Sequence, residues 1–305
     1  MEKYFQIKEI WKVIITYLKQ LIPYLKQVIT YLKQNKKIAA FSAVVAVVLV
    51  YSAASGGKNK AGARMEVEIE GVKVAFRWCP PGEFTRQWDE STQEYWEEEP
   101  MWDDDKRDFT ITLTKGFWLA ETEATQELWV AVTGENPSEG VRKKKVPVKN
   151  ISWDETQEFI SKLNGTGIAP DGFEFRLPTE AQWEYACMAG TTGDRYGKLD
   201  AIAWYEDNSD GVSHEVGKKK PNAWGLYDMI GNVWEMCEDW YVGYPLENLT
   251  DYTGPQDGWD HVLRGGDWNT FAGNCSRSSR SRWDLRKTYI ETYYRGFRLA
   301  LVPKE

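Results

Sequence analysis

The chain has 305 residues, of which 14% are aromatic, and it contains 16 Trp and 25 Gly. So many Trp and Gly residues predict a loop-rich fold rather than a helical bundle, and the length suits one large domain or two small ones. The formal net charge of -8 argues against nucleic-acid binding, and two histidines, His214 and His261, cannot supply a three-histidine metal centre.

Residues 1–35 form a Lys-rich segment in which the motif YLKQ recurs at Tyr17, Tyr24 and Tyr31. This seven-residue period predicts an amphipathic helix, which Pro23 would kink. The helix could form a coiled coil that makes the chain a homo-oligomer, or it could lie on an anionic membrane surface in the cytoplasm. The sequence leaves both alternatives open.

Residues 36–55 are expected to form a transmembrane helix, because Ile38 to Ala54 is an uncharged and mostly apolar run. Many lysines precede the run and few basic residues follow it closely, so the positive-inside rule places the N-terminus in the cytoplasm. A cleaved signal peptide is the alternative, since SAAS resembles a cleavage site, although the preceding charged region is long for one. We therefore expect a single-pass membrane protein whose C-terminal domain lies outside the cytoplasm.

Residues 56–65 are expected to be a flexible linker and residues 66–305 a folded domain. The domain opens with MEVEIEGVKVAFRW, which has the composition of strands, and DFTITLTKGFWL at 108–119 alternates as a strand does. Between them, residues 85–105 are strongly acidic, which indicates a solvated loop or, less often, a cation site.

Three helices are predicted from their N-terminal caps. Thr125 precedes QELWVAVTG, and Ser152 precedes WDETQEFISKLN with Glu155 placed to complete a capping box. Thr179, the first residue of TEAQWEYACMAG, is the predicted cap of the third helix, and Gly190 stands near the end of that helix.

Five motifs then occur in a fixed order: VPVKNISWDETQEFISKLN, FRLPTEAQWEYACMAGTT, PNAWGLYDMIGNVWEMCEDWY, VLRGGDWN and GFRLAL. Together they resemble the sulfatase-modifying-factor family, that of the formylglycine-generating enzymes, over residues 74–302. The resemblance implies an α+β, loop-rich variant of the C-type-lectin fold and favours a bacterial origin. One departure follows PPGEF, where the family often has Met-Gly and this chain has Thr85, Arg86 and Gln87.

The resemblance also implies a calcium ion at the motif GLYDMIGNVWE. Its ligands would be the side chains of Asp228 and Glu235 and the backbone carbonyls of Gly231 and Val233, which are oxygen ligands of the kind that calcium prefers. The alternative is a loop held by backbone hydrogen bonds and by the packing of Trp234. A second calcium loop of the family has no convincing counterpart near residues 203–211.

The resemblance implies a Cu(I) site of the family's enzymes, in which two cysteines five positions apart hold the ion. Aligned on RGG, the first of these cysteines falls on Thr270, the second on Cys275, and a pocket serine falls on Asp267. Cu(I) is a soft ion that needs thiolate ligands, so Thr270 makes copper binding unexpected. Cys275 would be a catalytic residue only if the chain were an oxidase.

The cysteines and histidines do not indicate a zinc site, a three-histidine metal site or a catalytic base. The four cysteines, Cys79, Cys187, Cys237 and Cys275, contain no CxxC pair, so a structural zinc site is not expected and their disulfide pairing stays open. A related branch of the fold needs three histidine ligands, which this chain lacks. Both histidines are expected to be hydrogen-bonding loop residues rather than catalytic bases.

The C-terminal tract, residues 264–298, is rich in Arg and aromatic side chains, which dominate binding hot spots. Arg264 and Arg298 are expected in internal ion pairs. The candidate ligand-binding residues are Trp268, Asn269, Thr270, Phe271, Arg280, Arg282 and Trp283. Some proteins of this fold carry a C-terminal surface that a retroelement diversifies, and a single sequence does not settle whether this tract is one.

The expected function is a membrane-anchored module that binds a protein, peptide or glycan outside the cytoplasm and lacks oxidase activity. One alternative is a copper-dependent formylglycine-generating oxidase that acts on a sulfatase cysteine. A second is a structural subunit of an envelope assembly, associated through residues 1–35.

Overall fold

The computed structural model describes residues 60–86, 108–243, 247–284 and 294–304, without the side chains of Trp283 and Asp284. The expected helix in residues 1–35, the expected membrane span and most of the acidic segment lie outside these ranges. Within them, no helix is both long and apolar enough to cross a membrane. The first strand begins at Arg64, inside the segment expected to be a linker.

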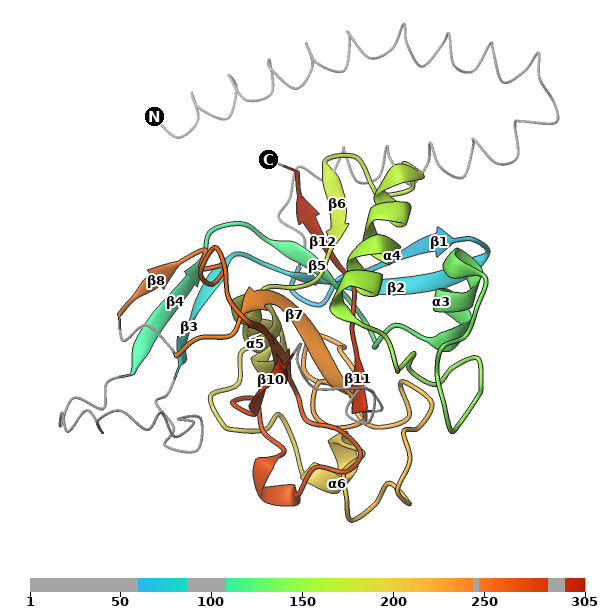
Figure 1. Cartoon of the computed structure of the whole chain (residues 1–305). Coiled ribbons are helices and arrows are strands. Elements are labelled where there is room, and N and C mark those ends of the chain that lie inside the picture. Colours follow the sequence, from blue (N-terminus) through green and yellow to red (C-terminus); the bar gives the residue numbers. More distant parts are fainter. Residues whose placement is uncertain (1–59, 87–107, 244–246, 285–293, 305) are drawn as a thin grey trace, which may run out of the picture. The chain divides into compact units, whose positions relative to one another are not determined.

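The largest sheet has five strands in the order β1-β2-β5-β12-β6, and every neighbouring pair in it is antiparallel (Figure 1). Chain segments from both ends of the domain meet in it, because the C-terminal strand lies between β5 and β6. Its strands are β1 (Arg64–Ile69), β2 (Val72–Cys79), β5 (Phe117–Ala120), β6 (Phe173–Arg176) and β12 (Ala300–Pro303).

Two smaller sheets are also present in the part of the chain that the structure describes. One has the order β10-β9-β7-β11 and the other β3-β4-β8. Their strands are β3 (Gly82–Arg86), β4 (Phe109–Leu113), β7 (Trp234–Trp240), β8 (Leu249–Thr250), β9 (Asp260–Arg264), β10 (Arg280–Asp284) and β11 (Arg295–Gly296). The strands expected around residues 66–79 and 108–119 are therefore confirmed.

The three predicted helices are present with the predicted caps. Thr125 caps α3 (Gln126–Thr133), and Ser152 forms a capping box with Glu155 at the start of α4 (Trp153–Gly165). Thr179 caps α5 (Glu180–Met188), which ends at residue 189 in the left-handed conformation just before Gly190. Short helices follow at α6 (Leu199–Ile202) and η2 (Ala272–Asn274).

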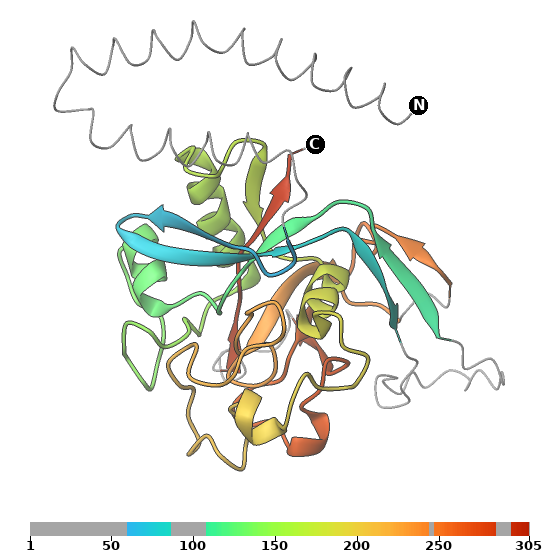
Figure 2. The same ribbon diagram turned by 180° about the vertical axis from the view of Figure 1, so that it is seen from behind.

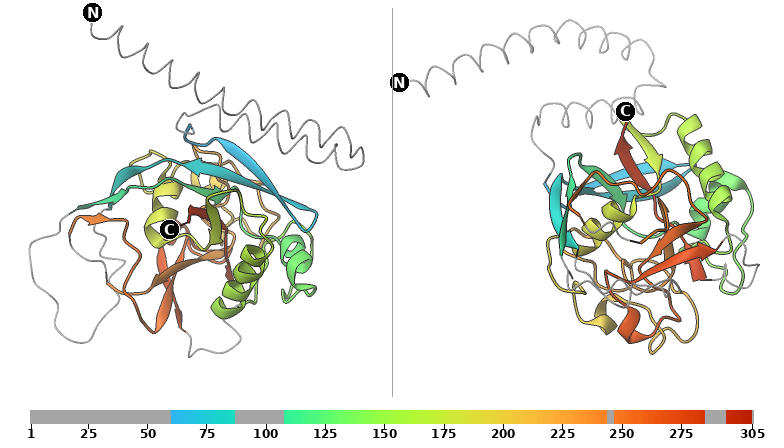
Figure 3. Two further views of the ribbon diagram at one scale, coloured as in Figure 1. Left: turned by 90° about the horizontal axis from the view of Figure 1, so that it is seen from above. Right: turned by 60° about the vertical axis from the view of Figure 1, so that its left-hand side comes forward.

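The helices cover the sheets without forming a bundle. Figures 1 and 2 show α3 at the outer end of the β1–β2 hairpin, where Leu128 and Trp129 join a buried cluster with Val67 and Ile69. Figure 3 shows β12 and β6 side by side, with α5 among the strands of the interior. A second buried cluster surrounds Trp183 of α5. The expectation of an α+β, loop-rich domain is confirmed.

Candidate functional site

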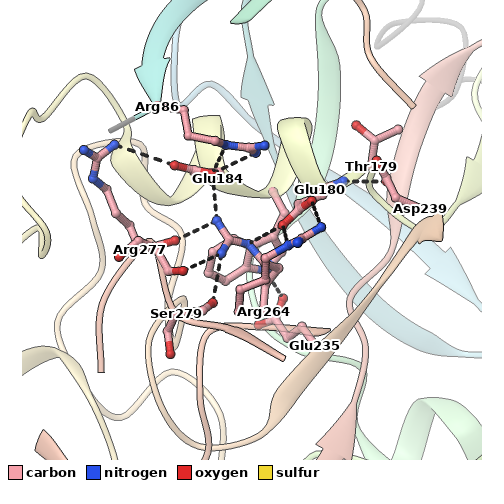
Figure 4. A network of polar contacts seen from close by, with 12 residues as sticks. Arg86, Thr179, Glu180, Glu184, Glu235, Asp239, Arg264, Arg277 and Ser279 are labelled. Carbon is pink, nitrogen blue, oxygen red and sulfur yellow. Dashed lines mark hydrogen bonds and ion pairs between the residues drawn. The ribbon is translucent and has the colours of Figure 1, made fainter. Parts of the chain in front are cut away.

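A buried charge network, drawn in Figure 4, lies beneath the C-terminal tract. Glu184 of α5 accepts hydrogen bonds from Arg86 Nε and from Arg264 Nη2, each at 2.8 Å. One turn earlier, Glu180 accepts two bonds from Arg280, at 2.7 and 3.1 Å. Burial alone would raise the pKa of Glu180, but the charges of Arg280, Arg86 and Arg264 lower it to about 2. Both the helix and the tract are therefore tied to one ion-pair cluster.

Arg264 fixes the backbone of the tract as well. Its side chain is fully buried, and it donates to the carbonyls of Arg277, Ser278 and Ser279 at 2.8–3.0 Å. A guanidinium offers five donors in a rigid fork, so it can hold several carbonyls and a carboxylate at once. The expectation that Arg264 and Arg298 form internal ion pairs is confirmed, since Arg298 pairs with Glu235 at 2.6 Å.

The turn after Arg264 is closed by Asp267 and Thr270. Thr270 Oγ1 donates to Asp267 Oδ1 at 2.8 Å and accepts the Asp267 backbone N–H at 2.9 Å. Gly265 and Gly266 have φ of 96° and 78°, and Thr270 lies 3.3 Å from the position where a Cβ on Gly266 would stand. Side chains avoid such φ values, so this corner requires glycine. The hydroxyl of Thr270 is thus committed to the turn.

Cys275 faces the interior of the same turn. Its side chain is fully buried, its Sγ lies 3.7 Å from the Thr270 carbonyl oxygen, and burial raises the pKa of its thiol to about 12. Arg195 donates to the backbone carbonyls of Cys275, at 2.6 Å, and of Ala272. Thr270 offers a hydroxyl that is already hydrogen-bonded, so Cys275 is left without the second thiolate ligand that Cu(I) prefers.

All four cysteines are free and buried, so none of the possible disulfides forms. Burial likewise raises the pKa of Cys187 to about 12 and those of Cys79 and Cys237 well above the ordinary value. The four thiols therefore stay protonated near neutral pH.

Three of the candidate ligand-binding residues follow one another on the outer side of the turn. Asn269 is exposed, Phe271 is 66% exposed, and Trp268 is half-buried against Tyr294, with ring centroids 5.2 Å apart. Single exposed apolar side chains are common on protein surfaces, so the feature of note is that Phe271 shares one turn with Trp268 and Asn269. Thr270 lies among them, but its hydroxyl serves the turn.

One of the two arginine candidates, Arg280, differs from the expectation of an exposed side chain. Arg280 is buried in the charge network, with 3% of its side chain exposed, because it neutralises Glu180 at the start of α5. Arg282 is 36% exposed and lies 3.7 Å from Asp260. Trp283 pairs through its backbone with His261 of β9, and its side chain is outside the described residues. The structure therefore brings together residues 268–271 and leaves Arg280 out of that surface.

The expected calcium loop is sharply bent, with positive φ at Asp228, Gly231 and Asn232. Asp228 is 1% exposed, and its Oδ2 accepts the Gly217 N–H at 2.6 Å, while its Oδ1 has no partner among the described residues. Glu235 accepts bonds from Arg298 on both oxygens and from Trp183 on Oε2.

Glu123 is a further buried carboxylate at this loop that sequence reasoning missed. Its Oε2 accepts the Asn232 amide at 3.2 Å, and its Oε1 has no partner within the described ranges. Burial, Asp228 and Glu235 raise the pKa of Glu123 well above its usual range, whereas Arg298 acts in the opposite direction. In the sequence, Glu123 is one acidic residue in ETEAT with nothing to distinguish it from its neighbours.

Glu123 and Asp228 each have one buried carboxylate oxygen without a partner among the described residues, and such oxygens are of the kind that a cation uses as ligands. No group of three or more His, Cys, Asp or Glu side chains in the described part of the chain is arranged to hold a metal. A cation here would therefore need backbone carbonyls as well, as calcium commonly uses.

Both histidines have structural contacts. His261 lies in β9 between Trp153 and Trp240, with ring centroids 4.0 and 3.8 Å away, and burial lowers its pKa to about 4. His214 stacks on Trp204 at 3.8 Å and its Nε2 lies 2.7 Å from the Ser209 carbonyl oxygen. The expected hydrogen-bonding role is confirmed for His214, and His261 is a strand residue rather than a loop residue.

Comparisons with known proteins identify the family and agree with the fold. The profile of the family described as "Sulfatase-modifying factor enzyme 1-like domain" matches residues 75–302. Among solved structures, "Treponema denticola variable protein 1" is 29% identical with a TM-score of 0.66, and the comparison covers 79% of this chain and 99% of that one.

Two curated relatives carry different names. "Chaperone protein LppX" of Paenibacillus barcinonensis is 25% identical over 228 residues, covering 58% of this chain and 78% of that protein. The "Formylglycine-generating enzyme" of Mus musculus is 29% identical over 175 residues, covering 49% of this chain and 44% of the enzyme. The match thus spans less than half the length of the mouse enzyme.

Proposed function

Because the matched profile covers most of its length, the chain belongs to the Sulfatase-modifying factor enzyme 1-like domain family, and we propose that it is a ligand-binding member that does not oxidise cysteine. The observation that carries the proposal is the state of the turn at residues 267–275. Where the resemblance implies a pair of copper-binding thiolates, Thr270 bonds to Asp267 and Cys275 is a single buried thiol.

The proposed binding surface is the exposed part of this turn, Trp268, Asn269 and Phe271. Its support is the combination of exposed aromatic and amide groups with a rigid base, because Arg264 and Arg195 hold the backbone underneath. A preorganised surface loses little conformational entropy on binding. Phe271 favours a protein or peptide ligand, since its ring offers apolar area and no hydrogen bond.

The location of the domain is part of the proposal. A helix at residues 36–55, which contains the apolar run from Ile38 to Ala54, would anchor the chain in a membrane, with the Lys-rich residues 1–35 in the cytoplasm and the domain on the other side. Residues 1–35 would also offer a helix for self-association. The resemblance implies a calcium ion held by Asp228, Gly231, Val233 and Glu235. Because both oxygens of Glu235 accept bonds from Arg298, we propose that Asp228, Glu123 and backbone carbonyls of this loop would hold the ion, which would stabilise the domain rather than take part in a reaction.

The proposal is tested by incubating the full chain with Cu(I), oxygen, a thiol reductant and a peptide that carries a sulfatase cysteine motif. Mass spectrometry of the peptide should find cysteine only. Conversion of that cysteine to formylglycine, with more than one turnover per chain, would instead establish the oxidase.

A further inference from the structure

A second concave site lies away from residues 267–275. It encloses about 560 Å³ between β6, β7, the start of α5, the loop at 251–256 and the end of β12. In Figures 1 and 2, β6 and β12 lie at the top of the view and the η2 turn near its bottom, so the two sites occupy different ends of the domain. A volume of this size suits a small molecule or a few units of a polymer.

An aromatic wall of the cavity is held rigidly. Trp240, at the end of β7, lines the cavity and is stacked on His261, which in turn stacks on Trp153. Tyr252 lines the cavity from the loop, and both Trp240 and Tyr252 are half-buried. An aromatic side chain that is fixed by stacking, as Trp240 is, offers apolar area at little entropic cost.

Hydrogen-bonding groups stand beside the aromatic wall. Glu238 and Trp240 of β7 both line the cavity, and the Glu238 carboxylate accepts a hydrogen bond from the Gln157 amide at 3.3 Å. Gln182 has its Oε1 held by the Thr179 N–H at 3.0 Å, and its amide nitrogen has no partner in the described part of the chain. Thr253 and Gln256 add an exposed hydroxyl and amide.

The lining is polar but close to neutral. It contains three carboxylates, Glu174, Glu238 and Asp251, and two cations, Lys115 and Arg176, for a net charge of -1. Glu174 and Arg176 neutralise each other at 2.6 Å, and Asp251 accepts bonds from the backbone and hydroxyl of Thr114. Such a lining disfavours an anionic ligand, and its net charge of -1 attracts a cationic ligand only weakly.

We propose that this cavity binds a neutral carbohydrate through Trp240, Tyr252, Glu238, Gln182, Thr253 and Gln256. Each sugar hydroxyl both donates and accepts, so it matches a lining that mixes carboxylate, amide and hydroxyl groups. The apolar C–H face of a pyranose ring packs against an aromatic side chain. This inference concerns a different surface from the proposed ligand site at residues 268–271 and stands independently of it.

The test uses the full chain in a detergent without a sugar headgroup. Cellohexaose, chitohexaose, laminarihexaose and mannohexaose are titrated by calorimetry, and a hexalysine peptide serves as the cationic probe. At least one oligosaccharide should bind. Glu238→Ala should weaken it about tenfold or more, the effect expected when hydrogen bonds to a charged group are lost. Thr253→Trp changes an exposed residue, leaves the core intact and should block the cavity.

Two control variants separate this site from others. Glu158→Ala removes an exposed carboxylate on α4, outside the cavity, and Phe271→Ala alters the proposed ligand surface. Both should leave sugar binding unchanged. The proposal is overturned if no oligosaccharide binds at millimolar concentration, if binding survives both cavity variants, or if hexalysine alone binds in a way that Glu238→Ala abolishes.

Discussion

The side chains of Thr270 and Asp267 satisfy each other: the threonine hydroxyl donates to the carboxylate while accepting the aspartate's backbone N–H. Both residues stand at positions where the family resemblance implies a copper-site cysteine and a pocket serine. The pair therefore replaces a metal-binding arrangement with a closed hydrogen-bonded turn. This relationship makes the turn a rigid support for the exposed residues around it.

Thr270→Val should destabilise the domain, because it leaves Asp267 with fewer donors in a buried position. The expected loss in the free energy of unfolding is about 1–3 kcal/mol, the usual cost of an unsatisfied buried group. Thr270→Ser keeps the hydroxyl and should lose less. Urea unfolding of the three proteins provides the measurement, and equal stability of the valine and serine variants would show that the hydrogen bonds are unimportant.

Arg264→Leu should be severely destabilising, since it removes one of the two arginine donors of Glu184 and leaves the carbonyls of residues 277–279 without the Arg264 guanidinium. Breaking a buried ion pair in this way typically costs about 3–5 kcal/mol. Arg264→Lys keeps the charge but not the fork and should recover only part of the loss. Arg64→Leu, which removes an exposed pair with Glu121, is the matched control and should change thermal stability little.

Asp239 should make the stability depend on pH. Burial, followed by the charge of Glu180, raises its pKa from 3.8 to about 7, so the folded state holds a proton that the unfolded state releases. The contribution of Asp239 to the free energy of unfolding is thus fully present below about pH 4 and is lost as the pH rises toward 7.

Asp239→Asn removes this titration and keeps an acceptor for the Glu180 N–H, which Asp239 Oδ2 accepts at 2.7 Å. The variant should equal the original protein in stability near pH 4 and exceed it increasingly up to pH 8. Asp210→Asn, at an exposed aspartate with φ of 54°, should show no such trend. The measurement is the urea midpoint of the original protein and of Asp239→Asn from pH 4 to pH 8. A constant difference between the two midpoints over this range would contradict the raised pKa of Asp239.

Calcium should raise the melting temperature in a saturable way, and EDTA should reverse the rise. Glu123→Gln removes a buried carboxyl group that lies beside Asp228 and Glu235. The variant should therefore have a higher melting temperature than the original protein in EDTA, and calcium should raise its melting temperature less. Glu158→Gln, at an exposed glutamate on α4, is the control. A melting temperature that does not respond to calcium in the original protein would leave the unpaired oxygens of Glu123 and Asp228 without this explanation.

Local signals in the sequence predicted much of the scaffold. The caps at Thr125, Ser152 and Thr179 are short-range hydrogen-bonding patterns, and they mark the starts of helices correctly. The order of the motifs predicted the α+β, loop-rich fold. The pairing of β12 with both β5 and β6 joins distant segments, and no local pattern reports such a contact.

The sites were harder to predict, because charge alone does not indicate burial. Arg280 and Phe271 lie in one Arg-rich and aromatic tract, yet Arg280 is buried against Glu180 and Phe271 is exposed. The partner of Arg280 lies 100 residues away, on α5. Glu123 escaped notice for the same reason, since its neighbours Asn232 and Asp228 come from a remote loop.

Cu(I) titration of the full chain tests the central claim most directly. The chain competes with a chromophoric Cu(I) chelator under anaerobic reducing conditions, beside a Thr270→Cys variant that restores the second thiol five positions before Cys275. The original chain should leave the chelator saturated, while the variant should withdraw copper from it. Tight binding of one Cu(I) per chain by the original protein would contradict the account.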